Sequence, residues 1–250
     1  TFAELKKGYL EFGETVEEVF VELAKAREFS VEKAEAREHK RTLPDVRTAF
    51  HAMNWKVQYP ITIQYEDLRM AFTSANGVQE LILKLVDTAY TANEYDEFLL
   101  FKYLLIKAIA HGQLKPVKIG TGDMNEAAVV FRGTSNQLTF MSKEYNASGV
   151  TTTTPKKDQY IFMDSMYNAS YDVNVLAGAF NMDKAEFIGK LILVENWTTF
   201  DNDRFAEIIE NSDMIEPVTD EELALMKDVK AVLADEEWRS EERRVGKECH

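Results

Sequence analysis

Apolar and polar residues alternate along two neighbouring segments of the chain, residues 46–51 and residues 56–63. The apolar positions of the second segment are Val57, Tyr59, Ile61 and Ile63. A period of two is typical of half-buried strands, so both segments are predicted to be strands. Pro60 has no N–H group for a ladder, which places the second strand at a sheet edge. His51 falls on the polar side with Arg47, where a solvated histidine is favoured over a functional one.

Apolar residues recur at helical spacing over the next long stretch, residues 78–109. This spacing predicts either one helix of about 50 Å, at ~1.5 Å per residue, or two helices with a break near Asn93. Gly112 is a typical stop signal at a helix C-terminus. Because the length exceeds the ordinary range for globular proteins, we interpret the stretch as a structural spine.

The rest of the chain mixes strand and helix patterns. Short strands are predicted at residues 15–23, 116–119, 159–164, 190–194 and 230–238. Residues 126–131 are predicted to form a helix with Asn125 as its cap. The acidic stretch 202–227 has a helical pattern, and we interpret it as a surface insertion. Together these elements predict an α+β protein.

The chain is strongly acidic, with a net charge of −14 and a mean hydropathy of −0.31. Binding to nucleic acid depends on Lys and Arg neutralising phosphates, so this charge argues against it. No apolar run approaches the ~20 residues that a membrane-spanning helix needs. We therefore expect a globular protein that repels polyanions and has no membrane partner.

Both ends of the sequence have unusual features. The C-terminal letters RSEERRVGKEC resemble the translation of a common sequencing adapter, so we treat residues 239–250 as non-native and exclude them. These residues hold four basic and three acidic side chains, so the remainder carries a net charge of −15. They also hold Cys249, the single cysteine. Since residue 1 is Thr1, we interpret the chain as entered in mid-sequence.

Each candidate chemical motif in the sequence has a structural interpretation. The loop GTGD, residues 120–123, lacks the spacing of a phosphate-binding or dinucleotide-binding loop, and a turn is favoured. Adjacent carboxylates such as Glu17–Glu18 and Glu66–Asp67 are expected by chance in so acidic a chain. No nucleophile elbow or zinc-binding HExxH motif occurs in the sequence. We therefore predict no catalytic residue, no cofactor and no metal site.

Several segments resemble the major capsid proteins of small Bacillus podophages, a group within the tailed phages. The segments 61–72 (ITIQYEDLRMAF), 94–105 (EYDEFLLFKYLL) and 172–194 (DVNVLAGAFNMDKAEFIGKLILV) carry much of this resemblance. The region of the extension loop is matched at Gly13, Thr15, Glu17, Glu18, Pro44, Val46, Phe50 and His51. The resemblance is weak over residues 133–157.

The resemblance implies the tailed-phage major capsid fold, an α+β architecture. Residues 1–70 would be the extension loop with its base strands, and residues 71–120 the peripheral domain with the spine helix. Residues 121–238 would be an incomplete axial domain. The resemblance also implies subunit contacts through the extension loop, for which the candidate residues are Glu17, Glu18, Val57, Tyr59, Ile61 and Ile63.

The function implied by the resemblance is that of a structural subunit, not an enzyme. The subunits would assemble into hexamers and pentamers of an icosahedral shell that encloses double-stranded DNA without reading its sequence. Scaffolding and portal proteins would be further partners. Assembly in the host cytoplasm would place the protein in the virion.

Two alternatives stay open at this point. An encapsulin-type compartment shell would share the fold, and a cargo-enzyme gene beside this one would favour it. A metal-dependent hydrolase that uses acidic residues would instead bind a divalent metal at a near-stoichiometric ratio.

Overall fold

The computed structural model describes residues 13–26, 30, 43–52, 55–64, 66, 77–120, 124–145, 148–172 and 190–235. The strands are β1 (Thr15–Val21), β2 (Val46–Ala52), β3 (Gln159–Asp164), β4 (Lys190–Val194) and β5 (Ala231–Asp235). The helices are α3 (Gly77–Ala110), α4 (Met124–Gln137), α5 (Ser165–Tyr171), α7 (Ala206–Asn211) and α8 (Asp220–Met226). Two short 3₁₀ turns are η2 (Lys156–Asp158) and η4 (Asp203–Phe205). The mixed α+β class predicted from the sequence is confirmed.

The long helix α3 runs unbroken through Asn93, so the one-helix alternative is confirmed. It ends in a Schellman motif, because Gln113 N donates to Ala108 O at 2.9 Å and Gly112 N donates to Ile109 O at 3.0 Å. Gly112 has a φ of +69°, a conformation that glycine adopts without steric cost. The predicted stop signal is therefore confirmed.

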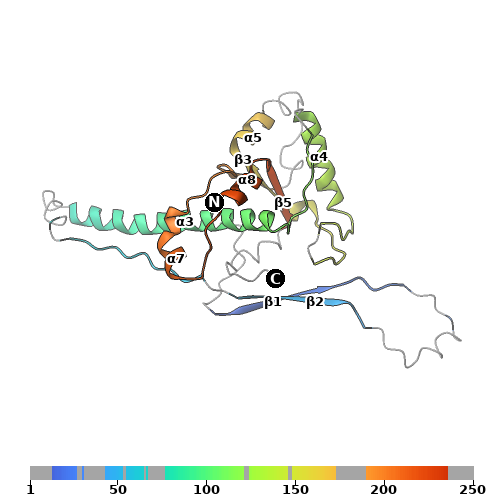
Figure 1. Ribbon diagram of the computed structural model, residues 1–250, viewed down its shortest axis with the longest axis horizontal. Coiled ribbons are helices and arrows are strands. Elements are labelled where there is room, and N and C mark those ends of the chain that lie inside the picture. The colour runs from blue at the N-terminus through green and yellow to red at the C-terminus, as the bar shows by residue number, and fades with distance from the viewer. Residues whose placement is uncertain are drawn as a thin grey trace.

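Burial divides α3 into two halves. All its buried residues fall within the C-terminal half, where Leu105 and Ile106 are completely buried. The N-terminal half projects from the body, accompanied by the extended residues 55–64 (Figure 1). The C-terminal half of the helix is thus part of the core and the N-terminal half is at the surface, although apolar residues recur at helical spacing in both halves.

A three-stranded sheet packs against the buried half of α3. The strand order is β4-β3-β5, with β3 parallel to β4 and antiparallel to β5. The central strand β3 is almost fully buried, and Phe162 packs on Phe101 of α3 with ring centroids 4.8 Å apart. The strands predicted at residues 159–164, 190–194 and 230–238 are therefore confirmed, the last within residues 231–235.

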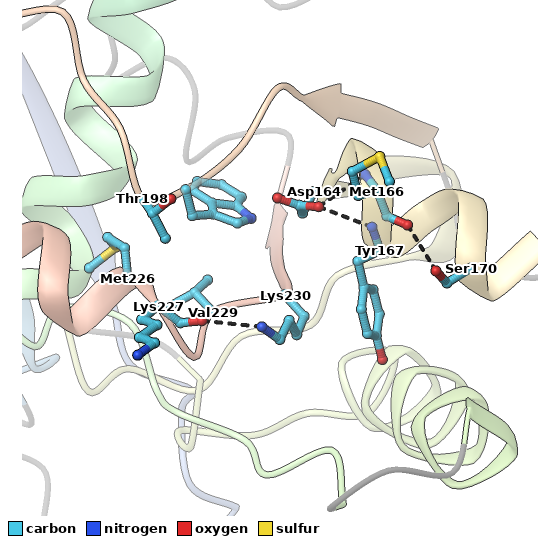
Figure 2. A pocket seen from close by; sticks show the side chains of 10 residues that line it. Asp164, Met166, Tyr167, Ser170, Thr198, Met226, Lys227, Val229 and Lys230 are labelled. Atoms are coloured by element: carbon cyan, nitrogen blue, oxygen red, sulfur yellow. Dashed lines mark hydrogen bonds between the residues drawn. The ribbon is translucent and has the colours of Figure 1, made fainter.

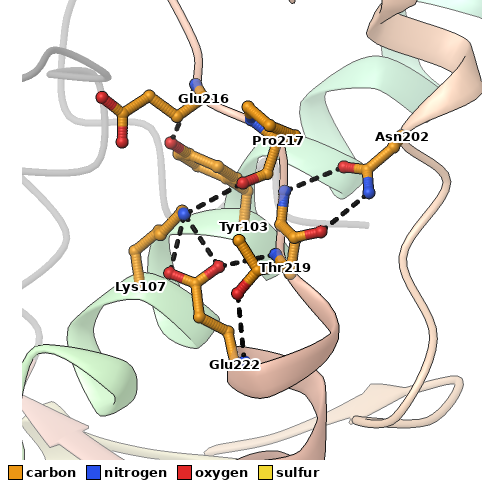
Figure 3. Close-up of polar contacts among 8 residues, drawn as sticks. Tyr103, Lys107, Asn202, Glu216, Pro217, Thr219 and Glu222 are labelled. Atoms are coloured by element: carbon orange, nitrogen blue, oxygen red, sulfur yellow. Dashed lines mark hydrogen bonds and ion pairs between the residues drawn. The ribbon is translucent and has the colours of Figure 1, made fainter.

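The interpretation of residues 202–227 as a surface insertion is wrong. Four of its apolar side chains are at most 3% exposed and belong to the main core: Phe205, Ile215, Val218 and Met226. Polar contacts tie the same stretch to α3 (Figure 3), where Lys107 Nζ pairs with both carboxylate oxygens of Glu222 at 2.7 and 2.8 Å. Its many acidic residues cover the outside of a segment whose inside completes the core.

Three smaller predictions are also wrong. Residues 56–63 are extended but form no strand, and β2 pairs with β1 instead. Residues 116–119 likewise form no strand. Asn125 is the second residue of α4 and not its cap. Residues 239–250 lie outside the described residues.

Candidate assembly interface

The antiparallel pair β1–β2, which we call the arm, is two-faced. It lies below the body of the molecule in Figure 1. The register pairs Val19 with Thr48 and Val21 with Val46. Since side chains alternate across a strand, these residues share one face with Phe50. That face is open to solvent: the three valines are about half exposed, and Phe50 is 67% exposed.

The opposite face of the arm is turned toward the rest of the chain. Phe20 and Ala49 on this face are half-buried. An exposed stripe of large apolar side chains usually marks a surface that a partner covers. The outward face of the arm therefore has the properties of an interface.

The predicted contact residues Glu17 and Glu18 lie on different faces of the arm. Glu17 is exposed and stands opposite Phe50, on the outward apolar face. Glu18 is half-buried on the inner face. His51 lies in β2 opposite Val16.

The other predicted contact residues lie in the segment 55–64. Its beginning is fastened to the body, because Trp55 packs edge-on against Phe205 with ring centroids 5.9 Å apart. Tyr59 Oη donates to Asp96 Oδ2 of α3 at 2.9 Å. Burial, and then this hydrogen bond to a carboxylate, raise the pKa of Tyr59 above its ordinary value.

The four predicted contact residues of this segment therefore separate into two pairs. Val57 and Tyr59 are half-buried within their own chain, so less of their surface is open to a partner. Ile61 and Ile63 are 44% and 40% exposed and stay available to a partner. That any of the four makes a subunit contact remains a prediction.

The projecting half of α3 adds a second exposed apolar surface. Its exposed residues include Ile82, Leu83, Val86 and Tyr90, of which Tyr90 is 71% exposed. The segment with Ile61 and Ile63 leads toward this end of the helix (Figure 1). In Figure 1 the arm lies below the body and the N-terminal half of α3 projects to its left, so one chain carries two separate apolar surfaces.

A hollow of about 310 Å³ lies beside α5 and the start of β5 (Figure 2). Its carboxylate, Asp164 Oδ1, accepts from Met166 N and Tyr167 N at 3.0 Å and so caps α5. Lys230 Nζ donates to Lys227 O at 3.1 Å. These polar groups make local structural contacts, and the arrangement offers no pairing of a nucleophile with a base among the lining residues.

Among the described residues, no three His, Cys, Asp or Glu side chains gather in a way that could hold a metal ion. Within the same residues, no helix has the length and apolarity needed to cross a bilayer.

Sequence patterns alone do not identify the outward face of the arm as a contact surface. A signal is present, since Val19 and Val21 lie two positions apart, and therefore on one face, in a segment predicted to be a strand. The sequence does not show that β1 pairs with β2, however, so it does not connect these residues with Val46 and Phe50.

The sequence of this chain is similar to the sequences of known phage proteins. A family profile of the Phi29-like phage major capsid proteins matches residues 1–240. The major capsid protein of Bacillus phage GA-1 is 36% identical over 202 residues, covering 78% of this chain and 43% of that protein. The major capsid protein of Bacillus phage B103 is 32% identical over 204 residues, covering 79% and 45%. The chain thus spans less than half the length of these relatives.

Solved structures show the same fold at lower identity. The capsid structure of Staphylococcus phage Andhra aligns with a TM-score of 0.60 and 16% identity, covering 93% of this chain and 68% of that one. A chain in the structure of the head fiber and inner core protein gp22 of bacteriophage P68 aligns with a TM-score of 0.58 and 15% identity, covering 94% and 68%. The α+β phage capsid fold is therefore confirmed. By its match over residues 1–240 and its identity to the Bacillus phage proteins, the chain belongs to the Phi29-like phage major capsid protein family.

Proposed function

We propose that the complete protein is the structural subunit of an icosahedral phage head that assembles into hexamers and pentamers. The observation that carries this proposal is the outward apolar face of the arm. In a single chain Val21 and Phe50 are 52% and 67% exposed, so covering the exposed part with a partner is favourable by about 25 cal/mol per Å² of apolar area. Family membership makes a second copy of the same chain the natural partner.

The arrangement of the two apolar surfaces supports ring formation. The arm face and the projecting end of α3 are unlike surfaces on one molecule. When unlike surfaces of identical subunits bind each other, the contact is heterologous and closes into a ring if the rotation permits. We propose that the arm of one subunit covers the exposed end of α3, with Ile61 and Ile63, on its neighbour.

The charge of the chain supports a container for DNA. The net charge is −14, or −15 without residues 239–250. A wall with this charge repels phosphates, so it encloses packed double-stranded DNA without binding it tightly or reading its sequence. The same feature disfavours a direct nucleic-acid-binding function for the chain.

The proposed parts of the subunit follow the family resemblance. Residues 1–70 are proposed as the extension loop, residues 71–120 as the peripheral domain and residues 121–238 as the axial domain. Within the proposed axial domain, α8 packs against the spine helix α3 and so connects the axial domain with the peripheral domain. Scaffolding and portal proteins are proposed partners, with assembly in the host cytoplasm and a final location in the virion.

The proposed role is structural and not enzymatic, as expected for a member of a capsid protein family. The relatives are phage proteins, which supports a phage head over an encapsulin-type compartment.

The test is a pair of matched substitutions in the complete protein. Phe50→Glu places a charge on the outward arm face, and Val129→Glu places one at an equally exposed apolar position on α4. We expect both variants to fold with unchanged circular dichroism. Only Phe50→Glu should fail to form closed shells, because a carboxylate buried without a partner is costly. Electron microscopy and sedimentation velocity give the readout. Closed shells from Phe50→Glu at the yield of the unmodified protein would contradict the proposal.

A further inference from the structure

The root of the arm is attached to a distant loop of the same chain. Glu22 follows β1, and its Oε1 accepts a hydrogen bond from Thr151 Oγ1 at 2.7 Å. Its Oε2 accepts from Lys143 Nζ in an ion pair. On β2, Arg47 Nη1 donates to the backbone oxygen of Ser148. All three partners lie in residues 141–152, which follow α4.

This loop is braced against the body independently of the arm. Ser142 and Thr152 exchange two backbone hydrogen bonds of 3.0 Å. Thr154 N donates to Leu138 O at 2.8 Å, and Tyr145 Oη donates to Gln137 Oε1 at 2.7 Å. The contacts of the arm therefore end on a supported loop.

Close approach of the loop to the arm is visible at Gly149. Its φ is +67°, a region that other residues rarely adopt. A Cβ atom at this position would lie 2.9 Å from Arg47 Nη1. The glycine therefore permits both the turn of the loop and the approach of the guanidinium.

The position of these contacts decides which face of the arm is outward. Glu22 continues the side of β1 that carries Phe20, and Arg47 stands opposite Phe20 in the ladder. Both anchors are thus on the inner face, and the face with Phe50 is turned away from the body. We infer that Glu22 and Arg47 form a latch with residues 141–152 that holds the apolar face of the arm outward. The inference rests on the proposed function only in treating that face as the surface for a neighbour.

The latch is tested on the full chain before any assembly, by measuring the distance between the arm and the body. Spin labels are placed at two exposed positions, with Thr48→Cys on the arm and Val129→Cys on α4, in a Cys249→Ser background. Pulsed electron spin resonance then gives the distribution of distances. With the latch intact we expect one narrow distribution.

Removing the latch should broaden this distribution. In Glu22→Gln/Lys143→Met we expect the fraction of chains with an undocked arm to rise by up to about fivefold, the upper end of the range for a surface ion pair. The matched control is Lys115→Met, which removes the ion pair between Lys115 and Glu144 in the same loop without touching the arm. The reversed pair, Glu22→Lys/Lys143→Glu, should restore the narrow distribution.

Two results would overturn the latch. One is an unchanged distribution in Glu22→Gln/Lys143→Met with Gly149→Ala added, and the other is equal broadening in Lys115→Met. Neither depends on shell formation. A failed latch would therefore leave the result of Phe50→Glu, and with it the proposed function, to be judged separately.

Discussion

Arg204 binds the carboxylate of Asp96 through two hydrogen bonds, with Nε 2.7 Å from Oδ1 and Nη2 3.2 Å from Oδ2. The two residues are 108 positions apart in the sequence, and Asp96 is only 6% exposed. Tyr59 Oη completes the group at 2.9 Å from Oδ2. One buried carboxylate thus joins the segment that follows the arm, the spine helix α3 and the stretch 202–227.

Removing the arginine should be costly because it leaves Asp96 as a buried charge. We expect Arg204→Met to lower the free energy of unfolding in urea by about 3 kcal/mol, the low end for a broken buried pair. About a third of the Arg204 side chain is exposed, so water partly replaces it. Tyr59→Phe should cost about 1 kcal/mol. Lys157→Met, at an exposed position, serves as the control and should change stability by less than about 0.5 kcal/mol. An Arg204→Met effect as small as that of the control would refute this account.

Glu222 should make stability depend on pH in the acid range. Burial acts to raise its pKa, but the hydrogen bonds from Lys107 and from the backbone of Thr219 outweigh burial and lower the pKa below 4.5 (Figure 3). A carboxyl group with a lowered pKa in the folded state stabilises above its ordinary pKa, and this contribution is lost as the pH falls. The difference in unfolding free energy between the unmodified chain and Glu222→Gln should therefore shrink from pH 7 to pH 3.5. At pH 7 we expect it to be about 1–3 kcal/mol. A difference that is constant with pH would show that the ion pair is not the cause.

Proline substitutions should separate the two halves of α3. Proline within a helix costs about 3 kcal/mol or more. At Leu105, which is completely buried, the loss of core packing adds to this cost, so we expect Leu105→Pro to prevent folding. Leu85 is half-buried in the projecting half, so Leu85→Pro should reduce helicity while the core stays folded. Far-ultraviolet circular dichroism and tryptophan fluorescence give the two readouts, and equal loss of both signals in the two variants would argue against the division.

The latch should be insensitive to pH near neutrality. The hydrogen bonds from Lys143 and Thr151 lower the pKa of Glu22 from 4.5 to about 2. The charged groups at the root of the arm are Glu22, Lys143, Arg47 and Asp45, which pairs with Arg47 at 3.4 Å. The contribution of Glu22 is complete above pH 4.5 and is lost as the pH falls toward 2. The distance distribution between the arm and α4 should therefore be the same at pH 8 and pH 5. Broadening within that range would contradict the assignment of Glu22.

Secondary structure with a strong local signal was predictable from the sequence. The long apolar repeat and Gly112 determined α3 and its end, because helix periodicity and a C-terminal glycine act within a few residues of one another. The strands at residues 159–164 and 190–194 were likewise predictable from signals within a few residues of one another. The resemblance to a known family also indicated the class of fold, because it combines many positions that are each a weak signal alone.

Long-range partners were decided only by the tertiary structure. Alternation in residues 56–63 was read as a strand, but an extended segment alternates in the same way when it packs along a helix, and Tyr59 bonds to Asp96 instead of joining a ladder. The acidic letters of residues 202–227 indicated a surface, because charge dominates the composition while only a few irregularly spaced side chains, such as Phe205 and Met226, enter the core. The periodicity of apolar residues in a sequence indicates that one face of a helix or strand is apolar. Which distant surface covers that face depends on how the whole chain closes around α3, and the outward face of the arm is the one that this closure leaves uncovered.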